Sequence, residues 1–115
     1  MTLLEAIATR DRDVLTELLS DDVIFHSPVQ TYRGRDQVML LLMAIGGILE
    51  NLEVTRQLDG VTFFEATVEE HPVDGVAVER EGEEGRVDEI TMMLRPLAQL
   101  QAAVARMARV LAERG

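Results

Sequence analysis

Two side chains in this sequence are candidates for proton transfer, His26 and Glu65. An imidazole titrates near neutral pH and can act as a general acid or a general base. Glu65 lies between Phe64 and Ala66, an unusual place for a carboxylate, where it would act as an acid in an apolar pocket. Each also has a structural interpretation: His26 as a hydrogen-bonded residue at a strand end, and Glu65 as the partner of Arg56 across a hairpin.

Two further polar side chains are candidates for binding a ligand. Tyr32 precedes a predicted helix, so its hydroxyl would stand at the mouth of a pocket, or its ring would only cover apolar surface. Arg95 ends a predicted strand, where it would bind an anionic group of a substrate or form a salt bridge with a carboxylate. His71, beside Pro72, is expected at the surface in a turn.

The composition excludes several kinds of chemistry. The 115 residues include no cysteine, which removes disulfides, zinc-thiolate sites and thiol catalysis. All 11 basic residues are arginines, which removes Schiff-base chemistry on a side-chain amine. The net charge of −10 repels phosphate backbones and anionic membranes, so we expect neither nucleic acid nor membrane as a partner. The 47% of hydrophobic residues predicts one folded domain over 1–115.

Acidic residues are concentrated between Glu65 and Glu89, where ten carboxylates accompany two arginines. Dense carboxylates can bind divalent cations, but this stretch has neither the spacing of a calcium loop nor a histidine pair at helical spacing. We therefore interpret it as the solvated surface of hairpins. The sequence predicts no metal site and no cofactor.

The first half of the chain has the periodicity of helices. We expect a short helix around residues 3–7 and a second one, capped by Asp11 or Asp13, that ends at Asp21 and Asp22. An extended run over 23–26, a loop over 31–34 and a third helix over 36–49 follow. The apolar run over 38–49 is shorter than the roughly 20 residues that span a bilayer. The opening residues do not resemble a signal peptide, which favours a cytoplasmic protein.

The second half of the chain is predicted to form strands. Apolar residues alternate with polar ones over 52–58, and Asp59-Gly60 is a strong hairpin signal. Further strands are expected over 61–70, 76–81 and 87–95, with turns at 72–75 and 82–85. Pro96 then opens a helix that extends to about residue 113. Helices followed by an antiparallel meander predict an α+β fold.

Two features of these elements predict further packing. In the strand over 61–70, both faces carry apolar side chains, so the C-terminal helix or a second copy of the chain is expected to cover one of them. In the last helix, apolar residues recur at steps of three and four. The helix should therefore pack over a pocket of its own chain or join a dimer interface. The residues of this stripe are Leu97, Leu100, Val104, Met107 and Leu111.

The order of these elements and their local sequences resemble a known family. The segments that carry the resemblance are Asp21–Val29, Tyr32–Asp36, Gly85–Ile90 and Arg95–Leu97. They are similar to the SnoaL-like branch of the nuclear transport factor 2-like superfamily, over roughly residues 2–97. The resemblance implies a cone-shaped, curved antiparallel sheet packed on N-terminal helices, with an apolar pocket and frequent dimerisation. Here the core would cover about 2–95, followed by an extra C-terminal helix over about 96–114.

The catalytic residues of two relatives are not found at the matching positions. In the ketosteroid isomerase pattern the general base falls on Ser27, the oxyanion tyrosine on Leu3 and the oxyanion acid on about Ala77. A serine alone cannot take a carbon-bound proton, and Leu or Ala cannot donate a hydrogen bond to an enolate.

The limonene epoxide hydrolase pattern loses its carboxylates in the same way. Its paired Arg and Asp fall on Ala66 and Val68, its second Asp falls near Met92, and its water-holding Asn falls on His26. The resemblance therefore implies an apolar cavity with one ionisable group at its wall.

Three functions remain open from the sequence. The leading one is a homodimeric protein that binds a small hydrophobic ligand without the catalytic residues of its isomerase and epoxide hydrolase relatives. The second is a polyketide cyclase-like or isomerase-like enzyme that uses His26 with a carboxylate such as Glu65 or Asp88. The third is a dimeric interaction module with a vestigial pocket. The expected ligand-binding residues are Ile24, His26, Tyr32, Met39, Ala66, Val68, Met92 and Arg95.

Overall fold

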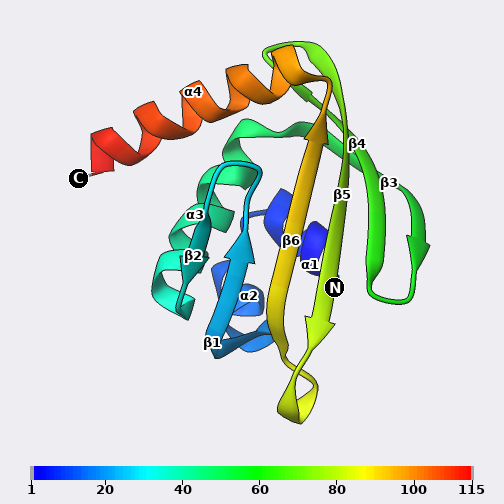
Figure 1. The fold of residues 1–115 in the computed structure, drawn as a ribbon, viewed down its shortest axis with the longest axis vertical. Coiled ribbons are helices and arrows are strands. Elements are labelled where there is room, and N and C mark those ends of the chain that lie inside the picture. Colours follow the sequence, from blue (N-terminus) through cyan, green and yellow to red (C-terminus); the bar gives the residue numbers. More distant parts are fainter. Residues whose placement is uncertain (1, 115) are drawn as a thin grey trace.

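The computed structural model describes residues 2–114, so Met1 and Gly115 of the expected domain lie outside the described residues. Within these residues, four helices and one six-stranded sheet make up the fold (Figure 1). The elements, in chain order, are α1 (Leu3–Ala8), α2 (Arg12–Leu18), β1 (Leu19–His26), β2 (Thr31–Arg33), α3 (Arg35–Ile48), β3 (Glu50–Leu58), β4 (Val61–Val68), β5 (His71–Glu81), a 3-10 turn (Glu83–Gly85), β6 (Val87–Arg95) and α4 (Leu97–Arg114).

The sheet has the strand order β2-β1-β6-β5-β4-β3. All neighbouring strands are antiparallel except β1 and β6, which run parallel, with Phe25 beside Ile90 and His26 beside Thr91. The α+β class and the curved, open sheet confirm the fold expected from the sequence. The parallel pair is the one departure from an antiparallel meander, and it arises because β6 returns to the sheet beside the first strand of the chain.

The helices α1, α2 and α3 cover one face of the sheet, and α4 extends beyond the end of β6 (Figure 1). The face that they cover is here called the inner face, and every second residue of the central strands is buried on it. Side chains such as Phe25, Phe64, Ile90 and Met92 pack there against α1 and α3. Each fully buried side chain of this size contributes roughly 1.5–3 kcal/mol before entropy is counted. The opposite face of the sheet is here called the outer face.

Gly75 allows a core side chain to pack directly on the backbone of the sheet. It lies between Phe64 on β4 and Leu94 on β6 in the strand register. A Cβ atom at this position would overlap the ring of Phe64. The ring therefore lies directly on the backbone of β5, which only glycine permits here.

Three element boundaries differ from the sequence-based expectation. The strand β1 begins at Leu19 rather than Val23, with Asp21 and Asp22 exposed within it. The expected loop over 31–34 contains the strand β2, because residues 31–33 pair with residues 24–26 of β1. The expected turn over 72–75 belongs to β5, and the chain turns instead at Glu69 and Glu70, which both have positive φ angles.

Other boundaries agree with the expectation. The hairpin turn falls on Asp59-Gly60, where Gly60 has a φ angle of 75°. The strand β6 ends at Arg95, and the backbone carbonyl of Pro96 accepts the first hydrogen bond of α4, from the N–H of Leu100. Within residues 2–114, every helix is too short or too polar to cross a membrane.

Candidate functional site

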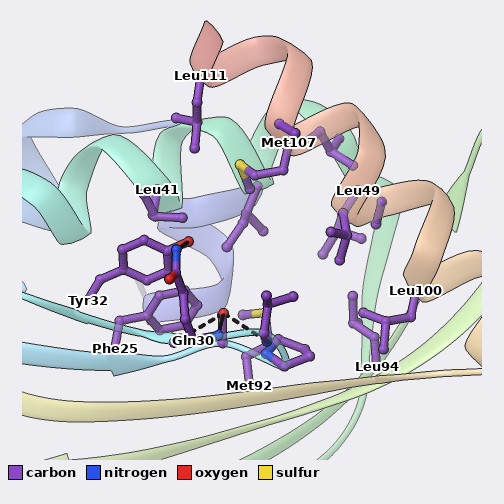
Figure 2. A pocket seen from close by; sticks show the side chains of 18 residues that line it. Phe25, Gln30, Tyr32, Leu41, Leu49, Met92, Leu94, Leu100, Met107 and Leu111 are labelled. Atoms are coloured by element: carbon purple, nitrogen blue, oxygen red, sulfur yellow. Dashed lines mark hydrogen bonds between the residues drawn. The ribbon is translucent and has the colours of Figure 1, made fainter. Parts of the chain in front are cut away.

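An apolar cavity of about 290 Å³ lies between α3, α4, the β1–β2 turn and the end of β6 (Figure 2). All but three of its 18 lining residues are apolar. The apolar ones are Phe25, Pro28, Val29, Leu41, Ile45, Ile48, Leu49, Met92, Leu94, Leu100, Ala103, Val104, Met107, Ala108 and Leu111.

Each wall of the cavity follows from the periodicity of its element. On β1 and β6, alternate residues point to the inner face, which places Phe25, Met92 and Leu94 on the floor. On α3, residues three and four apart share one face, which places Leu41 and Ile45 on one wall. Four residues of the apolar stripe of α4 form the opposite wall: Leu100, Val104, Met107 and Leu111. The helix therefore packs over a cavity of its own chain, the first of the two expected arrangements, while Leu97 is exposed outside the wall.

The polar part of the cavity is confined to the β1–β2 turn, which contributes Ser27 and Gln30, and to β2, which contributes Tyr32. The Ser27 hydroxyl donates to the Gln30 carbonyl at 2.9 Å and accepts from the N–H groups of Val29 and Gln30. It is therefore engaged in holding the turn. The Nε2 of Gln30 donates to the Tyr32 hydroxyl at 2.7 Å, and the Tyr32 ring stacks near Phe25 with centroids 6.4 Å apart.

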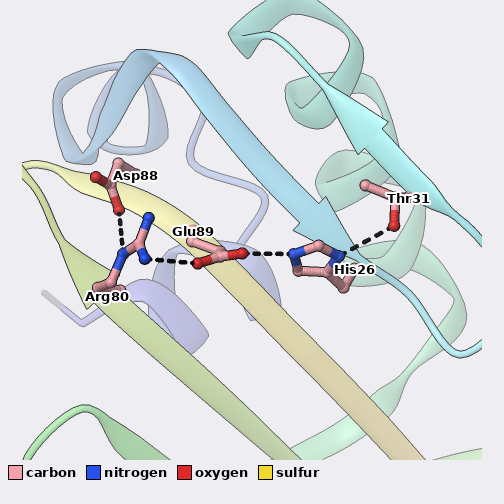
Figure 3. Close-up of polar contacts among 5 residues, drawn as sticks. All are labelled: His26, Thr31, Arg80, Asp88 and Glu89. Atoms are coloured by element: carbon pink, nitrogen blue, oxygen red, sulfur yellow. Dashed lines mark hydrogen bonds and ion pairs between the residues drawn. The ribbon is translucent and has the colours of Figure 1, made fainter.

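A chain of polar contacts runs across the outer face, through four neighbouring strands (Figure 3). His26 Nδ1 lies 3.0 Å from the Thr31 hydroxyl, and His26 Nε2 lies 2.6 Å from Glu89 Oε2. Arg80 extends the chain, with its Nε 3.2 Å from Asp88 Oδ1 and an Nη 3.2 Å from Glu89 Oε1. The hydrogen bond to Asp88, together with the negative charges of Asp88 and Glu89, raises the pKa of Arg80.

The expectation that His26 faces the cone interior together with Met92 is wrong. In β1 the buried positions are Val23 and Phe25, so His26 points to the outer face, while Met92 lies on the cavity floor. The carboxylate that His26 contacts is Glu89, rather than Glu65 or Asp88. The physical reason is the strand register, which sets Thr91 and Glu89, the outer residues of β6, beside His26 and Ile24.

Three other expected site residues, and also His71, lie away from the cavity on or beside the sheet. Ile24 is on the outer face of β1. Glu65 is exposed on the outer face of β4, where its register neighbours are Glu53 and Asp74 rather than Arg56. Arg95 forms an exposed ion pair with Asp74 at 3.1 Å. His71, expected on the surface in a turn, is exposed at the first position of β5.

The remaining expected ligand-binding residues divide between the core and the cavity. Met39, Ala66 and Val68 are buried in the hydrophobic core and do not contribute to the cavity wall. Tyr32 and Met92 line the cavity. Whether either contacts a ligand stays a prediction.

Sequence reasoning missed Phe25 and Gln30 as lining residues. Phe25 would have been found by assigning the inner face of β1 to Val23 and Phe25, a pair more apolar than Ile24 and His26. Gln30 carries no sequence signal of its own, because its role depends on the pairing of β1 with β2. Within residues 2–114, no cluster of His, Asp and Glu has the arrangement of a metal site.

One titratable side chain on the inner face has a shifted pKa. Glu79 on β5 is half-buried, at the end of the strand away from Asp74. Burial raises the pKa of Glu79 above the usual value of 4.5, and the charge of Glu81 adds to this. Glu79 does not line the cavity.

Comparison with known proteins places the chain among others of the same architecture. Residues 2–79 match the sequence model of the SnoaL-like domain family. No curated protein matches the chain. A solved structure of a steroid delta-isomerase from Pseudomonas aeruginosa is 34% identical, with 96% of this chain and 87% of that one covered and a TM-score of 0.88.

Two further solved structures are similar without a described activity. A protein with a cystatin-like fold from Silicibacter pomeroyi is 28% identical over 93% of this chain and 81% of its own, with a TM-score of 0.86. An NTF2-like protein of unknown function from Cytophaga hutchinsonii is 11% identical over 84% of this chain and 87% of its own, with a TM-score of 0.66, and shares the fold alone.

Proposed function

This chain belongs to the SnoaL-like domain family, and we propose that it binds a small uncharged apolar molecule in the cavity between α3, β6 and α4. The observation that carries the proposal is the composition of the cavity wall. Within residues 2–114 the wall includes no Asp, Glu, Arg or His. Ligand sites are typically concave and mostly apolar with a few polar groups, and this cavity fits that description.

The same composition argues against isomerase chemistry of the kind that the Pseudomonas aeruginosa relative is named for. Ser27, at the position of the isomerase general base, lines the cavity, but its hydroxyl donates to the Gln30 carbonyl. Leu3 and Ala77, at the other two catalytic positions, are buried in the core. Removal of a carbon-bound proton needs a general base that is unprotonated near neutral pH, and within residues 2–114 this wall supplies a phenol and an amide but no carboxylate or imidazole.

An enzyme that uses His26 is the alternative that the geometry supports less well. His26 and Glu89 do form a close pair, and Thr31 completes an arrangement of hydroxyl, imidazole and carboxylate. That arrangement lies on the outer face, opposite the cavity, so it does not face a ligand bound there. We assign it a structural role in joining β2, β1 and β6.

Fluorescence titration with N-phenyl-1-naphthylamine, an uncharged apolar dye, tests the proposed binding. We expect saturable binding by the full chain. Ala103→Phe and Ala108→Phe, which fill the cavity from α4, should abolish it. Ala105→Phe is the matched control, because Ala105 is exposed on the same helix outside the cavity wall. Absence of dye binding by the folded wild-type chain, or equal binding by all three variants, would contradict the proposal.

We also infer that the chain forms a homodimer through the outer face. Phe63, Val78 and Met93 are 39%, 38% and 52% exposed there, which leaves an apolar surface on three adjacent strands. Large apolar surfaces of this kind are a mark of interaction sites. The acidic row of Glu53, Glu65 and Asp74 lies at one end of this surface.

The apolar side chains, rather than the charges around them, would form the contact with a second copy of the chain. Arg80 lies at the end of β5 away from the acidic row, where it already pairs with Asp88 and Glu89. A contact between two copies uses the same surface on both, as twofold interfaces do.

A further inference from the structure

The polar groups of the cavity are gathered at one end, and we infer that they select an uncharged ligand of about two fused rings that carries one hydrogen-bond acceptor, held by the Tyr32 hydroxyl. This inference rests on the proposed binding function and names the chemistry of its ligand.

The donor is the Tyr32 hydroxyl, and Gln30 sets its direction. The phenolic oxygen accepts a hydrogen bond from Gln30 Nε2 at 2.7 Å. A phenol has one proton to donate, so this contact orients the O–H away from Gln30. The ring is half-buried and stacked near Phe25 on the cavity floor, and this packing holds the hydroxyl in place at the wall (Figure 2).

The other hydroxyl in the wall is already engaged. Ser27 Oγ donates to the Gln30 carbonyl and accepts from two backbone N–H groups, so its proton serves the turn. Apart from the Gln30 amide, the remaining side chains of the wall are hydrocarbon or thioether. An acceptor on the ligand would therefore lose its bond to water unless it lay at this end of the wall, against the Tyr32 hydroxyl or the Gln30 amide beside it, and an unpaired polar group elsewhere is costly.

The charge of the surroundings excludes anionic ligands. A carboxylate in an apolar cavity needs a cationic partner, and within residues 2–114 no arginine lines this wall. The net charge of −10 adds a repulsive field around the whole chain. Fatty acids and other organic anions should therefore bind more weakly than neutral molecules of the same shape.

The volume sets the size of the ligand. A cavity of about 150 Å³ accommodates benzene. The cavity of about 290 Å³ is therefore matched to two fused rings. The Tyr32 hydroxyl does not correspond to the tyrosine of the ketosteroid isomerase pattern. The position of that tyrosine is taken by Leu3, which is buried outside the cavity.

Three naphthalenes of nearly equal shape test the inference by displacement of N-phenyl-1-naphthylamine: 2-acetylnaphthalene, 2-ethylnaphthalene and 2-naphthoate. For the wild-type chain we expect the ketone to bind roughly three- to tenfold more tightly than the hydrocarbon, the range of a net hydrogen bond. The carboxylate should bind more weakly than both. Tyr32→Phe, which keeps the ring, should remove the advantage of the ketone and leave the affinity of the hydrocarbon unchanged.

Thr31→Val is the matched control, because it removes a hydroxyl from the same strand outside the cavity wall. It should keep the preference for the ketone. Equal affinity of ketone and hydrocarbon for the wild-type chain would overturn the inference while the proposed function stands. An equal loss of all affinities in Tyr32→Phe would also overturn it, because Tyr32 would then only pack against the ligand. If no naphthalene and no dye bound, the proposed function itself would fail.

Discussion

His26 Nε2 lies 2.6 Å from Glu89 Oε2, and this contact joins the two strands of the sheet that run parallel. The side chains are 35% and 29% exposed, so the contact is partly shielded from water. On the same strands, Phe25 and Met92 reach the opposite face and line the cavity. The histidine that the sequence marks as a catalytic candidate thus holds together the floor on which a ligand would lie.

The first prediction separates this structural role from catalysis or binding. Glu89→Gln and His26→Ala should each lower the free energy of unfolding by roughly 0.5–1.5 kcal/mol, the net contribution of a hydrogen bond. Urea denaturation measures this loss. Both variants should bind N-phenyl-1-naphthylamine with wild-type affinity, because neither residue lines the cavity. Loss of dye binding in a folded His26→Ala variant would contradict the structural assignment.

The second prediction concerns pH and follows from Glu79. Because burial raises the pKa of Glu79 in the folded chain, ionising it costs more there than in the unfolded chain. Its protonated form therefore favours folding at low pH. That contribution is lost as the pH rises from about 4.5 through the raised pKa.

Glu79→Gln removes this dependence. The substitution should stabilise the chain at about pH 7 and have less effect at about pH 4, where the wild-type carboxyl is protonated in both states. Urea denaturation of both proteins at the two pH values gives the comparison. An equal effect of the substitution at both values would show that Glu79 ionises as easily in the folded chain as in the unfolded one.

The sequence predicts the order of elements well but not which face of β1 is buried. Alternation of apolar and polar residues has a period of two, so it separates Ile24 and His26 from Val23 and Phe25 without saying which pair faces the helices. Both pairs contain an apolar residue. The partner strand decides, because the parallel register with β6 sets Phe25 beside Ile90. That contact joins residues far apart in the sequence, so local periodicity does not reveal it.

The turns show a similar limit. Asp59-Gly60 is placed correctly because glycine readily adopts the positive φ angle that the hairpin needs. The turn at Glu69 and Glu70 uses two residues that seldom adopt such angles, so Pro72 and Gly75 nearby are the stronger signal and mislead. The cavity wall is predicted best on α4, where the stripe of steps of three and four supplies Leu100, Val104, Met107 and Leu111.

The third prediction addresses the outer face as a dimer interface. Phe63→Glu and Met93→Glu each place a charge in the middle of the exposed apolar surface, and both should convert a dimer into a monomer. Light scattering after size-exclusion chromatography measures the mass. Leu97→Glu is the control, because Leu97 is 66% exposed on α4 rather than on the sheet. A monomeric wild-type chain, or a dimer that survives both substitutions, would contradict the proposal.

The fourth prediction concerns α4, which forms one wall of the cavity. A chain that ends after Pro96 loses six lining side chains and the cover over Phe25, Met92 and Leu94. Burying Leu100, Met107 and Leu111 is worth roughly 1.5–3 kcal/mol each where burial is complete, and these three are partly buried. We therefore expect the truncated chain to lose several kcal/mol of stability or to aggregate, and to lose dye binding.

A second truncation separates this role from a general effect of shortening the chain. Ending the chain after Leu111 keeps every residue that α4 contributes to the wall, so its melting temperature and dye affinity should stay close to wild type. Leu111→Ser in the full chain should weaken dye binding without unfolding the domain, because Leu111 contacts the cavity near the end of the helix. If the chain that ends after Pro96 kept an unchanged melting temperature and still bound the dye, α4 would not be a wall of the site.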